Sequence, residues 1–229
     1  MPPLRFAPKA VIFDIDGTIV DNMHLHAEAF AVFAGRHGLP PLTHEDRARI
    51  DGRRNSEIFP ILFNRDVPRD EWLAYEHEKE SLYREISTGR LAPMAGLSRM
   101  ITRLQADGIS MALATSAPRL NVEHTLREIG MAETFSTIVR GDEVGRGKPA
   151  PDVFIEAARR LAVTAADCLV FEDAPVGIEA AHAAAMRVVA LTTSFSVDHF
   201  HQLPLPPALV CANFDEYLDR KSTRLNSSH

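Results

Sequence analysis

From Pro93 onward, short apolar runs alternate with stretches in which apolar residues recur at helical spacing. The runs predict strands at 109–114, 136–139, 168–171 and 188–191, and the stretches between them predict helices around 97–104, 122–129, 154–161 and 178–185. Strands and helices that alternate in this way form a parallel sheet with helices on both faces. Together with a buried strand at 11–13, this pattern predicts an α/β fold.

The segment between that first strand and Pro93 contains no clear strand. Helices are predicted after Asp21, from Thr43, over 56–63 and over 70–86. We therefore expect residues 1–20 and 92–221 to form an α/β core, and residues 21–91 to form an all-helical domain inserted after the first strand. Because ligands of open α/β sheets bind at the carboxyl ends of the strands, this domain would stand over the binding crevice as a lid.

Two further segments are expected to lie outside the regular elements. Residues 195–207 are rich in proline and histidine, which is typical of a surface loop. Residues 222–229 are polar and show no periodicity, so we expect a disordered tail there.

Composition limits the classes of partner. The chain has 229 residues and a formal net charge of −6, whereas a non-specific nucleic-acid binder needs a basic face. A small anionic substrate remains compatible, because a few local cations suffice to bind it. No apolar run reaches the length of a membrane span, and the first residues lack the apolar core of a signal peptide. We expect a cytoplasmic monomer that binds a small molecule, with Cys168 and Cys211 reduced and with neither nucleic acid nor membrane as a partner.

Asp14 and Asp16 follow the first strand directly, and Gly17 allows a sharp turn after them. Two carboxylates that lie close together in a concave site repel one another unless a proton or a cation joins them. Mg²⁺ suits such a pair, because it prefers carboxylates, waters and substrate phosphate as ligands. An ionised aspartate there can attack phosphorus, and the second can act as general acid and base. The alternative is that both acids only shape the turn after a strand.

Thr115 and Ser116 follow the next predicted strand, which ends at Ala114. Hydroxyl groups at that place, together with backbone amides, can bind a phosphate oxygen. A serine or threonine before a helix is also a common cap, so the structural role stays open as an alternative.

Lys148 lies between Gly147 and Pro149, which restrict the backbone around it. Its ammonium could neutralise carboxylates and a transferring phosphoryl group. The neighbouring residues do not fit a P-loop, which would need a glycine at Asp142 and a hydroxyl residue at Pro149. A lone loop lysine is more often solvated, and this alternative stays open.

Glu172 and Asp173 follow the predicted strand 168–171. They could supply the oxygen ligands for a divalent cation that Asp14 and Asp16 lack, with Asp173 as the direct ligand and Glu172 acting through water or by orienting other groups. The alternative is a pair of acids at a helix start, where the helix dipole favours negative charge.

Four strand ends thus present, in chain order, two acids, two hydroxyl groups, a lysine and two more acids. The carboxyl ends of parallel strands lie at the same edge of a sheet, so we expect these groups to meet. Together they make a full set for metal-assisted phosphoryl transfer.

The motifs resemble those of the haloacid dehalogenase superfamily, in particular its β-phosphoglucomutase-like subgroup with a helical, C1-type cap. The similar segments are Asp14-Ile-Asp16-Gly-Thr, Thr115-Ser116, Gly147-Lys148-Pro149-Ala-Pro151-Asp152 and Phe171-Glu172-Asp173-Ala-Pro-Val-Gly177. The resemblance implies a Rossmann-like core, an inserted helical cap and Mg²⁺ as cofactor. It also implies a role for each site residue, with Asp14 as nucleophile, Asp16 as acid and base, Thr115, Ser116 and Lys148 binding the phosphoryl group, and Asp14, Asp16, Glu172 and Asp173 forming the metal site.

The inserted segment contributes further candidates. His26 matches the hinge histidine that in β-phosphoglucomutases helps to position the acid/base aspartate, although a histidine of an amphipathic helix would explain it equally well. The run Gly52-Arg53-Arg54-Asn55 resembles the substrate-specificity loop of the family, and its arginines could hold a second anionic group. Lys79 and Glu80 lie on the longest predicted helix; they could face the site, although a solvated charged face is the more common arrangement and is the one we expect.

The resemblance leaves two reactions to choose between. A mutase must hold a sugar bisphosphate at both ends, and β-phosphoglucomutases use a cap-loop arginine and a serine-lysine-asparagine run for the far phosphate. Here these positions read Asn55 and Ala117-Pro118-Arg119, although Arg53, Arg54 or Arg119 could substitute.

We therefore expect a Mg²⁺-dependent phosphatase of a small phosphorylated metabolite, of the sugar-phosphate kind, that acts through an aspartyl-phosphate. A β-phosphoglucomutase, which converts β-glucose 1-phosphate to glucose 6-phosphate, is the alternative. A non-catalytic phospho-receiver or binding module is a third class, which the helical insert and the acid/base aspartate disfavour.

Overall fold

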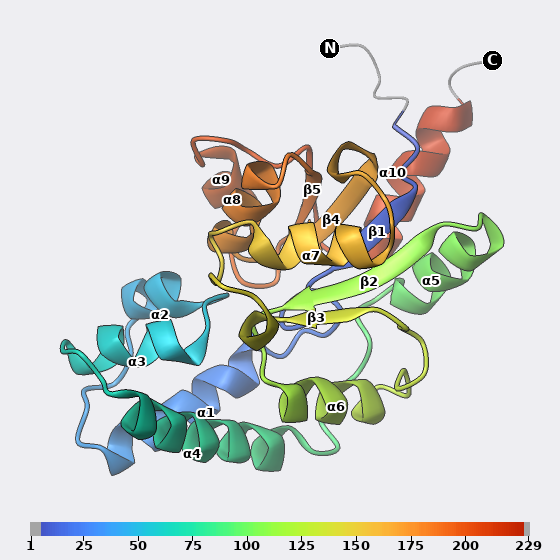
Figure 1. The fold of residues 1–229 in the computed structure, drawn as a ribbon. Coiled ribbons are helices and arrows are strands. Elements are labelled where there is room, and N and C mark those ends of the chain that lie inside the picture. Colours follow the sequence, from blue (N-terminus) through green and yellow to red (C-terminus); the bar gives the residue numbers. More distant parts are fainter. Residues whose placement is uncertain (1–5, 227–229) are drawn as a thin grey trace.

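A six-stranded parallel sheet forms the centre of the protein (Figure 1). The computed structural model describes residues 6–226. In spatial order the strands are β3 (Ile138–Arg140), β2 (Ser110–Thr115), β1 (Ala10–Phe13), β4 (Cys168–Glu172), β5 (Arg187–Leu191) and β6 (Leu209–Cys211). Phe13 at the end of β1 lies beside Leu113 of β2 and Phe171 of β4, so the carboxyl ends of these strands meet at one edge. The predicted α/β fold is confirmed, and each expected strand is present with slightly shifted bounds.

The two faces of the sheet bury alternate residues of the same strands. On β1, Ala10 and Ile12 point to one face, while Val11 and Phe13 point to the other. The first face packs against α7 (Asp152–Arg160), α8 (Pro175–Ala183) and α9 (Val197–His201). The second packs against α5 (Leu97–Ala106), α6 (Arg119–Glu128) and α10 (Phe214–Asn226). Each fully buried large apolar side chain contributes about 1.5–3 kcal/mol, so these layers hold the strand ends in a fixed arrangement.

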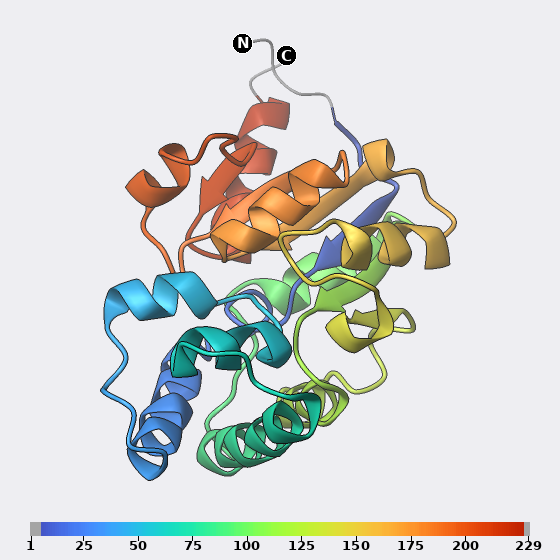
Figure 2. The same ribbon diagram turned by 60° about the vertical axis from the view of Figure 1, so that its left-hand side comes forward.

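Four helices lie between β1 and β2 in the chain, and we call them the helical insert. They are α1 (Met23–Arg36), α2 (His44–Ile50), α3 (Asn55–Phe63) and α4 (Arg69–Ser87). The helices α1, α3 and α4 pack around an apolar cluster that includes Leu25, Phe33 and Tyr83, and Ile50 of α2 packs in a second cluster with Phe30 and Ile58. Figure 2 shows the four helices together at one end of the sheet. Thr43 begins α2 as predicted, because its hydroxyl accepts from the Asp46 amide while the Asp46 carboxylate accepts from the Thr43 amide.

The segment 195–207, expected as a surface loop, contains the helix α9. Ser196 caps this helix by accepting a hydrogen bond from the His199 amide at 3.2 Å. Phe200 is completely buried against the sheet. The expectation of a simple surface loop was therefore wrong, because two aromatic side chains, Phe195 and Phe200, anchor the segment to the core.

The expected tail at 222–229 also differs from the structure. The helix α10 begins at Phe214, which is buried, and its backbone continues in helical form to Asn226. Residues 227–229 lie outside the described residues, as do residues 1–5 of the expected core.

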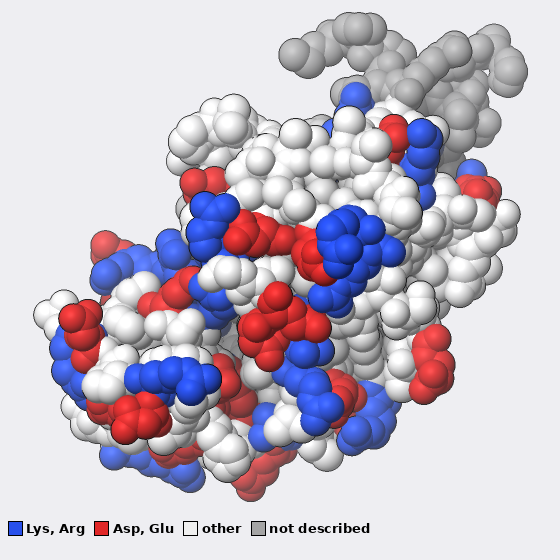
Figure 3. Space-filling view, viewed as in Figure 1, with Lys and Arg blue, Asp and Glu red and all other residues white. Residues whose placement is uncertain are grey.

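The surface of the helical insert carries both signs of charge. Figure 3 shows acidic and basic side chains interspersed over it and over the neighbouring core. Many of them are exposed pairs, such as Arg90 with Glu28 at 2.8 Å, and pairs of this kind contribute little to stability. Within residues 6–226, no helix is both long enough and apolar enough to cross a membrane.

Candidate active site

Asp14, Lys148 and Glu172 form a buried group at the carboxyl edge of the sheet. Asp14 follows β1 directly, Glu172 ends β4, and Lys148 lies in the connection between β3 and α7. The Lys148 ammonium donates to Asp14 Oδ1 at 2.6 Å, to Glu172 Oε1 at 2.7 Å and to the Ala114 carbonyl at 3.3 Å. All three side chains are almost completely buried, so this lysine is the counter-ion of two carboxylates and not a solvated loop residue.

The electrostatics of this edge favour binding of a proton or a cation. Burial raises the pKa of Asp14 to about 8; the Lys148 ammonium opposes this shift, and the carboxylates of Glu172 and Asp16 add to it. Burial also acts against the charge of Lys148, but attraction to Asp14 and Glu172 outweighs it and raises the pKa of the lysine. Burial, followed by the charges of Glu172 and Asp14, holds the pKa of Asp173 well above its ordinary range. The negative charge here exceeds what Lys148 balances.

Glu172 and Asp173 are neighbours with different surroundings. The second carboxylate oxygen of Glu172 accepts from the backbone amides of Asp173 and Ala174, both at 2.8 Å. Asp173 instead accepts from the hydroxyl of Thr18 at 3.4 Å and from the hydroxyl of Ser194. Glu172 is therefore fully engaged in holding the lysine and the turn after β4, while Asp173 is held by hydroxyl groups that can rotate away.

Gly17 brings the turn after β1 into contact with Asp173. Its φ is +75°, a conformation that favours glycine, and a Cβ atom there would lie 2.0 Å from Asp173 Oδ2. The glycine of the first motif is thus needed so that the acids of two strand ends can approach one another.

Asp16 lies beside His26, the residue that matches the hinge histidine of β-phosphoglucomutases. Asp16 Oδ1 accepts from the Asn22 side-chain amide at 2.6 Å and lies 3.4 Å from His26 Nε2. The other ring nitrogen of His26 is 2.9 Å from the Lys79 ammonium, and the ring stacks on Tyr83 with 3.8 Å between ring centroids. Because an ammonium only donates, the network assigns the proton of a neutral ring to Nε2, facing Asp16. Burial raises the pKa of Asp16, but His26 and Asn22 outweigh burial and leave this pKa below its ordinary value.

Lys79 and Glu80 are buried, so the expected solvated face on this part of α4 was wrong. Their charged groups lie 3.0 Å apart, and their exposed fractions are 2% and 4%. Glu80 also accepts from the side-chain amides of Asn55 at 2.8 Å and Asn121 at 2.5 Å. These partners come from α3 and α6, and they make burial of the glutamate possible.

The loop Gly52-Arg53-Arg54-Asn55 contacts the core directly. Gly52 has φ +81°, and a Cβ atom there would lie 2.8 Å from Val176 and 2.9 Å from Ala174. The Gly52 carbonyl accepts from the Ser116 hydroxyl at 2.7 Å, so in this arrangement Ser116 holds the loop. The neighbouring threonine, Thr115, is buried and accepts from the Ala117 amide at 3.0 Å.

The two arginines of this loop have different partners. Arg54 donates to Glu57 at 2.8 Å and to the Gly141 carbonyl at 3.2 Å, so its guanidinium is already engaged. Arg53 donates through Nε to the Arg49 carbonyl at 2.9 Å. Neither arginine points its guanidinium at Asp14 in this arrangement.

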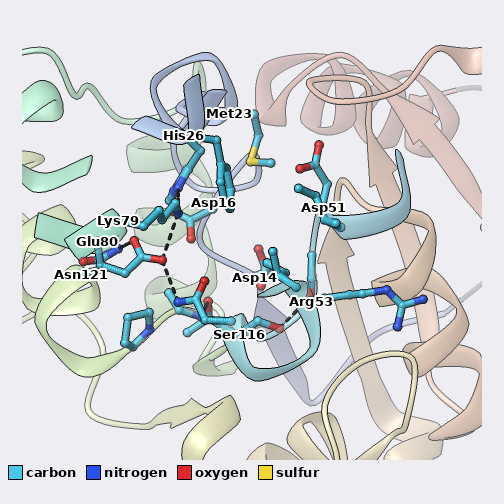
Figure 4. A pocket seen from close by; sticks show the side chains of 18 of the residues that line it. Asp14, Asp16, Met23, His26, Asp51, Arg53, Lys79, Glu80, Ser116 and Asn121 are labelled. Atoms are coloured by element: carbon cyan, nitrogen blue, oxygen red, sulfur yellow. Dashed lines mark hydrogen bonds and ion pairs between the residues drawn. The ribbon is translucent and has the colours of Figure 1, made fainter. Parts of the chain in front are cut away.

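The site residues line a cavity between the core and the helical insert (Figure 4). Asp14, Asp16, Thr115 and Asp173 are on its core side. The volume of the cavity is about 70 Å³, whereas pockets that enclose a drug-sized ligand have roughly 300–1,000 Å³. The cavity is therefore too small in this arrangement to enclose a ligand of that size.

Arg47 and Asp51 also line this cavity, and sequence reasoning missed them. They form an ion pair of 2.7 Å across one turn at the end of α2. Burial raises the pKa of Asp51, and the charges of Arg47, His26 and Lys79 oppose this shift. The available signal was an arginine and an aspartate four residues apart, directly before the loop that begins at Gly52.

The comparison with known families decides the identity of the fold. Residues 11–191 match the family model described as haloacid dehalogenase-like hydrolase. The chain belongs to the haloacid dehalogenase-like hydrolase family. All four strand-end motifs lie within the matched residues.

Individual members of the haloacid dehalogenase-like family resemble the chain over most of its length. Protein CbbY of Rhodobacter capsulatus is 32% identical over 197 residues, which cover 82% of this chain and 87% of the relative. The phosphorylated carbohydrates phosphatase of Thermotoga maritima is 31% identical, covering 78% of this chain and 82% of the phosphatase. The β-phosphoglucomutase of Bacillus subtilis is 31% identical, covering 79% of this chain and 82% of the mutase.

A solved structure agrees with these matches. The family IA, variant 3 haloacid dehalogenase hydrolase from Entamoeba histolytica has a TM-score of 0.82 at 28% identity, covering 90% of this chain and 94% of its own. The expected family with its β-phosphoglucomutase-like subgroup, the fold and the phosphohydrolase enzyme class are confirmed.

The donor groups at the carboxyl edge fit a hard divalent cation, as the haloacid dehalogenase-like family implies. Within residues 6–226, no three carboxylate, histidine or cysteine groups already converge as a set of ligands, because Asp14, Asp16 and Asp173 are turned to Lys148, Asn22 and Ser194. The fit rests on chemistry: two buried carboxylates, Asp14 and Asp173, repel one another and have raised pKa values. A cation bound by oxygen ligands relieves that repulsion.

Proposed function

We propose that this protein is a Mg²⁺-dependent phosphatase of a small phosphorylated metabolite, of the sugar-phosphate class. The observation that carries the proposal is the buried arrangement of Asp14 with Lys148 at 2.6 Å, beside Thr115 and in the same cavity as Asp16. A relative named phosphorylated carbohydrates phosphatase and another named hexitol phosphatase A, 29% identical, support a sugar phosphate as substrate.

In the proposed first step, the Asp14 carboxylate attacks the phosphorus atom and the bond to the leaving oxygen breaks, giving an aspartyl-phosphate. Asp16 donates a proton to the leaving alcohol; the nearby phosphoryl charge raises its pKa for this purpose. In the second step, Asp16 takes a proton from water, which attacks phosphorus and regenerates Asp14. Thr115 and Lys148 hold the phosphoryl oxygens by donating to them.

The residues proposed to hold Mg²⁺ are Asp14, Asp173 and the backbone carbonyl of Asp16. When bound, the cation neutralises charge that develops on the phosphoryl group. Glu172 would act indirectly, because its two oxygens are engaged with Lys148 and with backbone amides.

We also propose that the helical insert, residues 21–91, is a cap domain over the core of residues 1–20 and 92–221. The small cavity supports this proposal, because the insert and the core must separate for a sugar phosphate to enter. The contacts that would break on opening include the hydrogen bond from Ser116 to the Gly52 carbonyl and that from Arg54 to the Gly141 carbonyl.

A β-phosphoglucomutase remains the second candidate, and His26 beside Asp16 favours it. Against it stands Asn55, where the mutase resemblance calls for an arginine. Its side chain is buried and donates to Glu80 and Glu76, so it is not turned to a far phosphate. A receiver or binding module would show neither turnover nor a requirement for a base.

The proposed function is tested by incubating the purified protein with a panel of sugar phosphates, β-glucose 1-phosphate among them, with Mg²⁺ or with EDTA. We expect steady release of inorganic phosphate that EDTA abolishes and Mg²⁺ restores, because the carboxylate edge needs a cation. Glucose 6-phosphate is followed in parallel, with and without a trace of β-glucose 1,6-bisphosphate.

The outcomes of this test separate the candidates. Bisphosphate-dependent formation of glucose 6-phosphate with little free phosphate would make the protein a mutase. Turnover that is indifferent to chelation would refute the metal site, and no turnover on any substrate would favour a receiver or binding module.

Asp173→Asn should remove the response of the protein to Mg²⁺. In the wild type, Mg²⁺ at about 100 times its Kd should stabilise the fold by about 2.7 kcal/mol, seen as a rise in Tm. The variant lacks one charged oxygen ligand, so its Tm should not respond at the same concentration. Thermal denaturation with and without Mg²⁺ measures this directly, without activity as the readout.

Asp107→Asn is the matched control, because Asp107 is an exposed partner of Arg103 at the end of α5. Its Tm should rise with Mg²⁺ as in the wild type. An equal rise in the Asp173→Asn variant would remove Asp173 from the proposed metal site.

A further inference from the structure

The cationic side chains on the insert side of the cavity are either paired with other residues or directed away from Asp14 and Asp16. Arg47, Arg53 and Lys79 line it. Lys79 is paired with Glu80 at 3.0 Å and lies 2.9 Å from His26. The guanidinium of Arg53 extends away from Asp14 and Asp16 in Figure 4. A second anionic group on a substrate would therefore find little unpaired positive charge there.

Two contacts hold Arg47 in place. It pairs with Asp51 at 2.7 Å, and its guanidinium stacks over the ring of Phe30 with 5.4 Å to the centroid. Its Nη1 atom is buried and has no hydrogen-bond partner, so solvent does not reach it. Arg47 thus orients Asp51 through the ion pair, although 15% of its own side chain is exposed and it also lines the cavity.

Asp51 places a negatively charged group at the cavity, in contrast to these cationic side chains. Figure 4 shows it on the side of the cavity across from His26 and Lys79, and 11% of its side chain remains exposed. A carboxylate only accepts hydrogen bonds, so it attracts hydroxyl groups and repels phosphate or carboxylate groups. Like charges brought together in a desolvated site discriminate strongly between ligands.

We propose that Asp51, oriented by Arg47, determines specificity for monophosphates whose remaining part is uncharged and carries hydroxyl groups. Substrates with a second anionic group are disfavoured by its charge. This inference rests on the proposed phosphatase function and narrows its substrate class; it assigns Asp51 no part in the bond-breaking steps.

The test uses turnover of p-nitrophenyl phosphate with Mg²⁺ as a signal, and measures competitive inhibition by fructose 6-phosphate and fructose 1,6-bisphosphate. For the wild type, the inhibition constant of the bisphosphate should exceed that of the monophosphate by about tenfold. Asp51→Asn keeps the shape and removes the charge, so this ratio should fall about tenfold, with little change in p-nitrophenyl phosphate turnover. The ratio of the inhibition constants of 3-phosphoglycerate and glycerol 3-phosphate, in which a carboxylate replaces a hydroxymethyl group, should change in the same direction.

Arg47→Gln should raise the ratio of the two inhibition constants, because the Asp51 carboxylate then lacks its cationic partner. Damage to the fold would weaken all inhibitors alike, so opposite signs in the two variants are specific to charge. Asp66→Asn, an equal charge change at an exposed position of the insert, should leave the ratio as in the wild type.

An unchanged ratio in both pocket variants, with p-nitrophenyl phosphate still hydrolysed, would overturn this inference and leave the phosphatase proposal intact. Equal inhibition of the wild type by the monophosphate and the bisphosphate would also overturn this inference and leave the phosphatase proposal intact. Absence of any Mg²⁺-dependent turnover would instead overturn the phosphatase function, and the substrate class with it.

Discussion

Asp14→Asn should abolish phosphate release from every substrate that the wild type hydrolyses, lowering turnover by at least about 10⁴-fold. An amide cannot form the aspartyl-phosphate, because it lacks the anionic oxygen that attacks phosphorus. The change also takes away one of the two carboxylates that the Lys148 ammonium contacts. Steady-state and single-turnover release of phosphate, at saturating Mg²⁺, measure the loss.

The variant should still fold, since the amide keeps the shape of the carboxylate and Glu172 still pairs with Lys148 at 2.7 Å. Its thermal unfolding with and without Mg²⁺ checks this. Asp167→Asn is the matched control, because Asp167 pairs with Lys9 at a partly exposed position away from the cavity; it should keep full turnover. Near-normal turnover by the Asp14 variant would remove this residue from the mechanism.

Lys148→Met should weaken both the fold and the reaction. Removing the ammonium leaves Asp14 and Glu172 buried without their cation, and loss of one partner from a buried ion pair costs about 3–5 kcal/mol. Turnover should fall by about 10²–10³-fold or more, because the phosphoryl group loses a charged donor. Urea denaturation gives the free energy of unfolding, and phosphate release gives the turnover.

A double-mutant cycle separates the ion pair from simple packing. In the Asp14→Asn background, Lys148→Met should cost clearly less stability, because one of the two carboxylates is already neutral. The exposed Lys9→Met variant should unfold like the wild type. Equal costs of Lys148→Met in both backgrounds would show that the contact with Asp14 does not act as an ion pair.

Much of the core of the candidate site could be predicted from the sequence because most of its residues lie at strand ends, whereas Lys148 lies in the connection between β3 and α7. Asp14, Thr115 and Glu172 all occupy positions at strand ends, and the strands are visible as apolar runs. In a parallel sheet such ends meet at one edge, so local patterns alone indicated which groups would come together. The roles of these residues stay proposals, but their proximity follows from the fold.

The side of the cavity formed by the helical insert could not be predicted in the same way. Glu80 looked like a surface residue of α4, yet it is buried because Asn121, 41 residues away, donates to it. Arg54 looked free to bind an anion, yet Glu57 and the Gly141 carbonyl, 87 residues away, engage it. A local pattern carries no information about partners that only folding brings near.

The sequence by itself determined the α/β class, the inserted helices and which chemical groups lie at one sheet edge. These properties depend on hydrophobic periodicity and on residues adjacent in the chain. Only the tertiary structure decided which charged residues line the cavity, namely the Arg47–Asp51 pair and the buried Lys79 and Glu80. It also decided that the Ser116 hydroxyl binds the Gly52 carbonyl. The physical reason is that a buried charge is tolerated only with a partner in place, and such partners come from elements distant in sequence.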